Sequence, residues 1–181
     1  FFNIFFFKKF LLKKLIIVVF FFFFFQLIEK NSILPLYLAF KIINMQHSAF
    51  DQRNELIGLA TPRGFIIFDC TKKNVIYEAI FPAGGANCIA LLSDSNIVAT
   101  SGDDSRNGFL KTSIILWECN ESKIIRLLNV SEPVEYLYFR NDCLVVVFGS
   151  NINFYDCYDF SLTYTTTNPI PHRFCVALTQ S

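Results

Sequence analysis

The sequence has little of what metal centres, disulfide frameworks and nucleic-acid-binding surfaces need. Six cysteines occur in 181 residues, but none form a Cys-x-x-Cys pair, and only two histidines accompany them. Because zinc sites draw closely spaced ligands from Cys and His, a zinc site is disfavoured. The 16 Lys and Arg nearly balance the 15 Asp and Glu, and a net charge of +1 gives no electrostatic case for nucleic acid. The cysteines are interpreted as reduced thiols that pack mostly as small buried hydrophobes.

Groups that could act in catalysis are also scarce. His47 and His172 stand among turn-like residues, and no Ser or Cys occupies an elbow or triad setting. Residues 82–87 (PAGGAN) contain a glycine pair but lack the Gly-Lys-Ser/Thr of a phosphate-binding P-loop. The sequence therefore predicts no enzyme activity and no cofactor.

The first 25 residues differ in composition from the rest of the chain. They use only Phe, Leu, Ile, Val, Lys and Asn, and they hold 12 of the 23 Phe. The apolar run at residues 15–28 is 14 residues long, whereas a transmembrane helix needs about 20. No small-residue cleavage site follows, as a signal peptide would require. These amino acids also have A/T-rich codons, and the only methionine is Met45. Residues 1–44 are thus a Phe-rich hydrophobic segment with three readings: a membrane anchor, a cleaved signal, or mistranslated upstream sequence.

A short phrase recurs three times after Met45. It reads GFIIFDC at residues 64–70, SIILWEC at 113–119 and NINFYDC at 151–157, with the copies 49 and 38 residues apart. Self-similarity at a period of about 40 residues in a strand-rich chain is typical of propeller blades with four strands each. The acid that follows the aromatic residue either starts a turn or marks a WD-type repeat. Three copies in register favour the repeat.

Short strands separated by turn residues fill the remainder of the chain. Three strands are expected in the first unit, four in the second and four in the third, and residues 174–178 (FCVAL) would begin another. The sequence therefore predicts an all-β, WD40-like β-propeller fragment of about two and a half to three blades. The expected blades are 45–81, 82–130 and 131–168, with the start of a fourth at 169–181.

Residues 45–181 resemble the amino-terminal part of the PROPPINs, the WIPI-type seven-bladed propellers of autophagy. The second and third blades carry the most specific phrases of this resemblance. The matching phrases are ELIGLATPRGFIIFDC, NIVATSGDDSRNGFLKTSIILWEC, PVEYLYFRNDCLVVVFGSNINFYDCYDFSLTYTTTNP and PHRFCVAL. Because a propeller closes about four to eight blades into a ring, the chain is expected to be a fragment of a longer product that exposes apolar faces between blades.

The resemblance implies a non-enzymatic scaffold that, at full length, binds phosphatidylinositol 3-phosphate or the 3,5-bisphosphate and recruits autophagy machinery during autophagosome formation. It also implies a cytoplasmic protein, peripheral on autophagic, endosomal or vacuolar membranes. PROPPINs hold the lipid through an Arg-Arg-Gly motif on a later blade, where guanidinium groups bind phosphate bidentately. This sequence has no Arg-Arg pair, so no lipid-binding residue is assigned. The alternatives are a generic WD-repeat interaction scaffold without lipid binding, or the same blades anchored in a membrane through residues 1–28.

Residues 101–112 (SGDDSRNGFLKT) are the most function-like stretch that remains. The run from Asp103 to Gly108 imitates the start of an EF-hand, but Ile114 occupies the position of the bidentate Glu and strands flank the loop, which disfavours calcium. In PROPPINs the second-blade loop is similar in place to a region that engages the long lipid-transfer protein of autophagy. The resemblance therefore implies a partner contact here, with a solvated loop without a partner as the alternative. The candidate partner-binding residues are Asp103, Asp104, Arg106 and Asn107.

Overall fold

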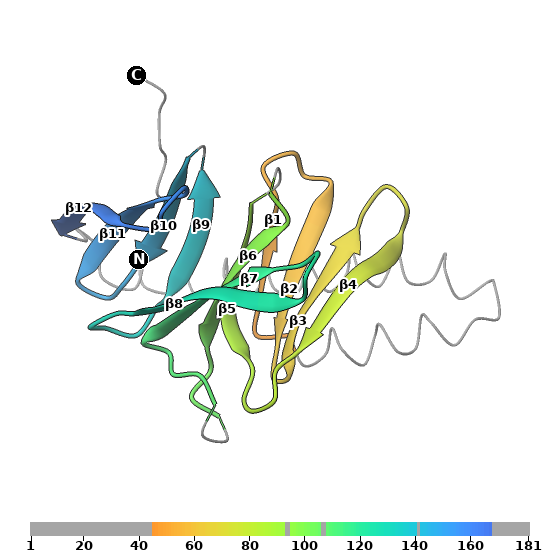
Figure 1. The fold of residues 1–181 in the computed structure, drawn as a ribbon, viewed down its shortest axis with the longest axis horizontal. Helices are drawn as coiled ribbons and strands as arrows, with labels where there is room; N and C mark the ends of the chain where they lie inside the picture. Colours follow the sequence, from red (N-terminus) through yellow and green to blue (C-terminus); the bar gives the residue numbers. More distant parts are fainter. Residues whose placement is uncertain (1–44, 93–94, 106–107, 141, 168–181) are drawn as a thin grey trace, which may run out of the picture. The chain divides into compact units, whose positions relative to one another are not determined.

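A computed structural model of the chain describes residues 45–92, 95–105, 108–140 and 142–167. These residues form three four-stranded antiparallel sheets, and the strands of each sheet follow one another in chain order (Figure 1). The first sheet holds β1 (His47–Phe50), β2 (Leu56–Thr61), β3 (Gly64–Asp69) and β4 (Asn74–Ile80). The second holds β5 (Ala86–Leu92), β6 (Ile97–Gly102), β7 (Ser113–Glu118) and β8 (Lys123–Asn129). The third holds β9 (Tyr136–Arg140), β10 (Cys143–Val147), β11 (Asn151–Asp156) and β12 (Leu162–Thr167). The all-β prediction is confirmed, and no helix occurs among these residues.

Strand β1 is an addition to the three strands expected in the first unit. It has four residues, His-Ser-Ala-Phe, and its pattern is too short and too polar to identify from the sequence. Its pairing with β2, from His47 opposite Ala60 to Phe50 opposite Ile57, makes it a strand. The first sheet therefore has the same four-strand order as the other two.

Each copy of the repeated phrase forms the third strand of its sheet, as β3, β7 and β11. The acid that ends each strand accepts hydrogen bonds from the backbone N–H groups two and three positions later, so it fixes the turn into the fourth strand. The acceptors and donors are Asp69 with Thr71 and Lys72, Glu118 with Asn120 and Glu121, and Asp156 with Tyr158 and Asp159. The acid thus starts a turn in all three copies, and the repeat is real.

Two apolar layers lie between the sheets. One layer joins the first and second sheets and includes Phe65, Ile89 and Ile115, none of which is exposed. The other joins the second and third sheets and includes Leu116 and Leu144, both fully buried. Fully burying one such side chain stabilises the fold by about 1.5–3 kcal/mol. The first strands β1, β5 and β9 also contact one another in that order, so each sheet packs face to face on the next.

The outer strands are joined to the following sheet by polar contacts. Trp117 of β7 donates its Nε1–H to the hydroxyl of Tyr77 on β4, at 2.7 Å, and that hydroxyl lies 2.9 Å from the Ser122 hydroxyl in the β7–β8 turn. The indole ring packs edge-on against Phe65, with 6.1 Å between the ring centres. Arg126 of β8 similarly donates to a backbone carbonyl in the β11–β12 turn of the third sheet. Each contact fixes a sheet against the next one.

Candidate functional site

The candidate loop joins β6 to β7 and covers residues 103–112. Its backbone is held by hydrogen bonds from Gly108 N to the Ser105 carbonyl, at 2.9 Å, and from Asp104 N to the Phe109 carbonyl, at 3.3 Å. Two of the four candidate residues, Arg106 and Asn107, lie outside the described residues. The structure therefore describes the two arms of the loop on either side of this pair.

Asp103 joins the β6–β7 loop to the connection between β4 and β5. Its Oδ1 accepts the backbone N–H of Gly85 at 2.9 Å, the backbone N–H of Ser105 at 3.0 Å and the Ser105 hydroxyl at 2.7 Å. Partial burial raises the pKa of this carboxyl, but the hydrogen bonds from Ser105 and Gly85 outweigh that effect, and the net pKa is lowered. The ionised carboxylate is thus a structural acceptor at neutral pH.

Asp104 is exposed and holds the other arm of the loop. It adopts a left-handed backbone conformation with a φ of 62°, which Asp tolerates better than most residues. Its Oδ1 accepts the Lys111 backbone N–H at 2.6 Å, and its Oδ2 lies 3.8 Å from the Lys111 ammonium. Asp104 therefore binds the backbone of its own loop, whereas Asp103 binds both its own loop and the β4–β5 connection.

Glycines allow three connecting segments to approach at backbone distance. A Cβ on Gly108 would lie 2.4 Å from the Ala83 carbonyl oxygen, and a Cβ on Gly85 would lie 2.5 Å from the Pro62 carbonyl carbon. The β2–β3 turn, the β4–β5 connection and the β6–β7 loop are thus stacked against one another. The glycine pair of PAGGAN, excluded above as a P-loop, has this packing role. The glycine pair in this connection is a sequence feature that indicates close packing, but the sequence does not show which segment packs against it.

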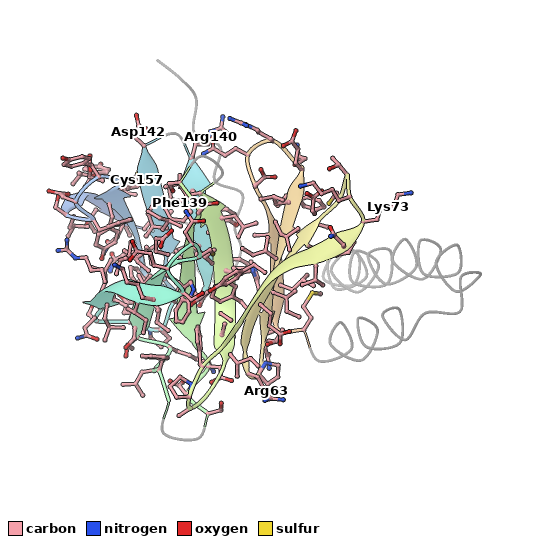
Figure 2. The ribbon with its side chains drawn as sticks, turned by 45° about the vertical axis from the view of Figure 1, so that its right-hand side comes forward. Arg63, Lys73, Phe139, Arg140, Asp142 and Cys157 are labelled. Carbon is pink, nitrogen blue, oxygen red and sulfur yellow. The ribbon has the colours of Figure 1, made fainter. Side chains whose placement is uncertain are left out.

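The loop also contacts the connection that leads into the third sheet. Val134 N donates to the Lys111 carbonyl and Val130 N donates to the Thr112 carbonyl, both at 2.9 Å. Arg63, in the β2–β3 turn, lies at this end of the first sheet, while Lys73 lies at the opposite end (Figure 2). The β6–β7 loop is therefore supported from both sides by the connections that precede and follow the second sheet.

The other candidate groups of the sequence do not assemble into a centre. Among the described residues, no cluster of three His, Cys, Asp or Glu side chains could hold a metal ion. Burial raises the pKa of the Cys88 thiol to about 11, and its Sγ lies 3.1 Å from the Glu135 carbonyl. His172 lies outside the described residues, whereas His47 is half-buried and packs edge-on against Tyr136, with 5.8 Å between the ring centres.

The described part of the chain has no helix with the length and apolar character of a membrane span. Residues 1–44, for which a membrane anchor was one of three interpretations, lie outside the described residues, and so does the expected start of a fourth blade at residues 169–181.

Three consecutive four-stranded meanders packed face to face define a partial β-propeller of about three blades, of the kind built by WD-repeat proteins. No family model matches the sequence. Among solved structures, the fold is similar to Hsv2 of Kluyveromyces lactis, with 18% identity and a TM-score of 0.58 over 68% of this chain and 37% of that one. The fold is also similar to KlAtg21 in its complex with the coiled-coil of AgAtg16, with 15% identity and a TM-score of 0.58 over 68% of this chain and 39% of that one.

These solved structures are PROPPIN β-propellers, so the resemblance found in the sequence is confirmed at the level of the fold. The chain is also similar to U3-55K, at 17% identity and a TM-score of 0.52, over 69% of this chain and 39% of that one. The chain therefore spans less than half the length of the propellers that it matches.

Proposed function

We propose that the protein is a non-enzymatic propeller scaffold of the PROPPIN type. In its complete form it binds membranes that carry phosphatidylinositol 3-phosphate or the 3,5-bisphosphate and recruits autophagy machinery to them. Two likenesses support this proposal: the blade phrases of the sequence resemble those of PROPPINs, and the fold is similar to those of Hsv2 and Atg21. On this proposal the protein is cytoplasmic and peripheral on autophagic, endosomal or vacuolar membranes.

The β6–β7 loop carries the partner-binding part of the proposal. Asp103 and Asp104 hold its arms through hydrogen bonds to Gly85, Ser105 and Lys111. The described arms of the loop, held in this way, have little conformational entropy left to lose on binding. We infer that the two acids position the loop and that the partner, the lipid-transfer protein of autophagy, binds through Arg106 and Asn107.

The KlAtg21 structure contains a coiled-coil partner, which supports a second autophagy protein as a ligand of this scaffold.

Capture experiments with the full chain test whether the β6–β7 loop binds the partner. The Arg106→Ala/Asn107→Ala variant is expected to lose capture of the lipid-transfer protein, while Lys73→Ala, at the opposite end of the first sheet (Figure 2), keeps it. Unchanged capture by the double variant would remove the loop from the proposal and leave the scaffold role intact.

Lipid binding is proposed for the complete protein, because this chain has no Arg-Arg pair and matches 37% of the Hsv2 chain. Flotation of the full-length product with liposomes, with and without 3-phosphorylated phosphoinositide, is the decisive measurement. Recovery that depends on the phosphoinositide supports the proposal. Equal recovery from both liposomes overturns it, and so does a full-length sequence whose later blades lack an Arg-Arg-Gly motif.

The alternatives are a generic WD-repeat interaction scaffold without lipid binding, or the same blades anchored in a membrane through residues 1–28. The fold is shared with U3-55K as well as with the PROPPINs, so the fold does not by itself require lipid binding. Mass spectrometry of the mature amino terminus distinguishes the anchored form: a terminus at Met45 excludes it, whereas retention of residues 1–28 together with membrane recovery independent of phosphoinositide supports it.

A further inference from the structure

An aromatic side chain anchors the β6–β7 loop in the layer between the first and second sheets. Phe109, on the arm of the loop that leads into β7, packs edge-on against Phe81, with 5.5 Å between the ring centres. Phe81 is 4% exposed, and its backbone N–H donates to the Arg63 carbonyl at 2.8 Å. The Phe81 ring also lies 6.1 Å from the ring of Phe65 and 5.8 Å from that of Trp117. Such aromatic pairs are favourable, so Phe109 joins the loop to the core that the two sheets share.

The backbone of Phe109 closes the loop at the same point. Its carbonyl accepts the Asp104 N–H at 3.3 Å. A Cβ on Gly102 would lie 2.0 Å from the Phe109 carbonyl oxygen, so residue 102 must be glycine for the two arms to meet. Arg106 and Asn107 lie between these arms in the sequence. One residue therefore provides both the ring that enters the layer and the carbonyl that joins the arms on either side of the candidate pair.

Leu110, the next residue, points the other way. Its side chain is 56% exposed, whereas the Phe109 ring packs against the buried cluster of the layer. The Leu110 carbonyl accepts the Ser113 N–H at 2.9 Å, a backbone contact that does not depend on the side chain. Phe109 and Leu110 are thus neighbouring apolar residues, one directed into the core and one into solvent.

The polar side-chain contacts of this arm give it less support than the ring does. Asp104, which accepts the Lys111 N–H and pairs with the Lys111 ammonium, is exposed. Water competes with hydrogen bonds and ion pairs at exposed sites, so such contacts stabilise little. Asp103 bonds the preceding arm and the β4–β5 connection instead. Among the described loop residues, Phe109 is the one whose apolar side chain packs in the layer, and it is the main side-chain attachment of this arm.

We propose that Phe109 is the positioning residue of the β6–β7 loop. Its ring holds the arm that leads into β7 against Phe81, and the loop thereby keeps the arrangement in which Arg106 and Asn107 bind the partner. This inference rests on the proposed partner-binding role of the loop, and it adds an apolar anchor to the two acids. Without the ring, the arm leaves the layer in a fraction of the chains, and the apparent affinity for the partner falls in proportion to the chains that keep the binding arrangement.

Amide hydrogen exchange of the full chain tests the anchor. In Phe109→Ala, protection of the Gly108 and Lys111 amides, which both donate within the loop, is expected to fall about tenfold. Leu110→Ala truncates the exposed neighbour in the same way, and protection is expected to stay within a factor of about two of the unchanged chain. If Phe109→Ala unfolds the chain, Phe109→Leu read against Leu110→Val gives the same comparison with a smaller change. Equal effects of the paired changes overturn the proposal.

Capture of the lipid-transfer protein by the full chain tests the positioning role. Phe109→Ala is expected to weaken capture about tenfold, and Phe109→Tyr, which retains the ring, is expected to restore it to within about threefold. Phe139→Ala removes a ring from the other apolar layer, toward the opposite end of the sheets from Arg63 (Figure 2). It controls for lost stability and is expected to leave capture unchanged. If it unfolds the chain, Phe139→Leu is compared with Phe109→Leu.

Each outcome of the capture experiment decides one point. Capture that is unchanged in Phe109→Ala, or that Phe109→Tyr fails to restore, overturns the proposal. A Phe139 variant that loses as much capture as the matching Phe109 variant assigns the effect to general stability and overturns it too. If the unaltered chain captures no partner, the proposed function of the loop fails, while the exchange comparison still decides whether Phe109 anchors the loop.

Discussion

Replacing Asp103 by Ala tests whether this carboxylate organises the candidate loop. The change removes the acceptor of three hydrogen bonds, from the backbone N–H groups of Gly85 and Ser105 and from the Ser105 hydroxyl. Ser105 can turn to water, but Gly85 is buried, and a buried N–H left without a partner costs about 1–3 kcal/mol. We therefore expect a loss of about 2 kcal/mol in the free energy of unfolding and a melting temperature lower by roughly 5 °C.

Urea unfolding of the full chain, followed through the fluorescence of its single Trp, measures this change. The matched control is Asp104→Ala, for which a loss of about 0.5 kcal/mol in the free energy of unfolding is expected because that carboxylate is exposed.

Asp103 should also make the stability of the chain depend on pH. Since the pKa of Asp103 is lowered in the folded chain, its stabilisation is present above the ordinary carboxyl pKa and is lost as pH falls through the folded value. The Asp103→Ala variant should lack this part of the acid transition. A loss below about 0.5 kcal/mol, or one no larger than that of Asp104→Ala, would refute the role assigned to Asp103.

Three further predictions concern the layers between the sheets. Thr100→Val should stabilise the chain by about 1 kcal/mol in urea unfolding, because the Thr100 hydroxyl is fully buried with no hydrogen-bond partner among the described residues; a destabilised variant would show that the hydroxyl is satisfied. Tyr77→Phe should cost about 1–2 kcal/mol and shift Trp117 emission, since it removes the acceptor of the indole N–H; unchanged emission and stability would contradict that bond. Because burial lowers the pKa of His47 from 6.5, stability should decline as pH falls below that value, and His47→Leu should abolish the decline; an unchanged pH profile would show that another group is responsible.

The repeated phrase was sufficient to find the third strands, because apolar alternation and the acid at the turn are properties of local sequence. The strand β1 was missed for the opposite reason. His-Ser-Ala-Phe has no strand pattern of its own, and it becomes a strand because β2 offers an unpaired edge beside it. Local pattern therefore predicts the strands that carry a run of apolar or β-branched residues, including the exposed outer strands β8 and β12, and it misses the one that its neighbour recruits.

For the candidate site too, the sequence predicted one part and the structure was needed for the other. The acids and the glycine of residues 103–112 made this loop a candidate from the sequence alone. Only the structure shows which backbone N–H groups donate hydrogen bonds to those acids. The bond from Gly85 to Asp103 spans 18 residues, and no spacing rule connects the two positions. The close contact of Gly85 with Pro62 could not be predicted from the sequence either, because it depends on two connections meeting in space.

By itself, the sequence determined the all-β class, the blade repeat and the resemblance to the PROPPINs, because each is written in residues close together in the chain. Only the tertiary structure decided what the acids, glycines and outer-strand residues do. Asp103 reaches another connection, and Tyr77 reaches the next sheet. The physical reason is that hydrogen-bond partners and burial are set by packing between sheets, which brings together residues that the chain keeps apart.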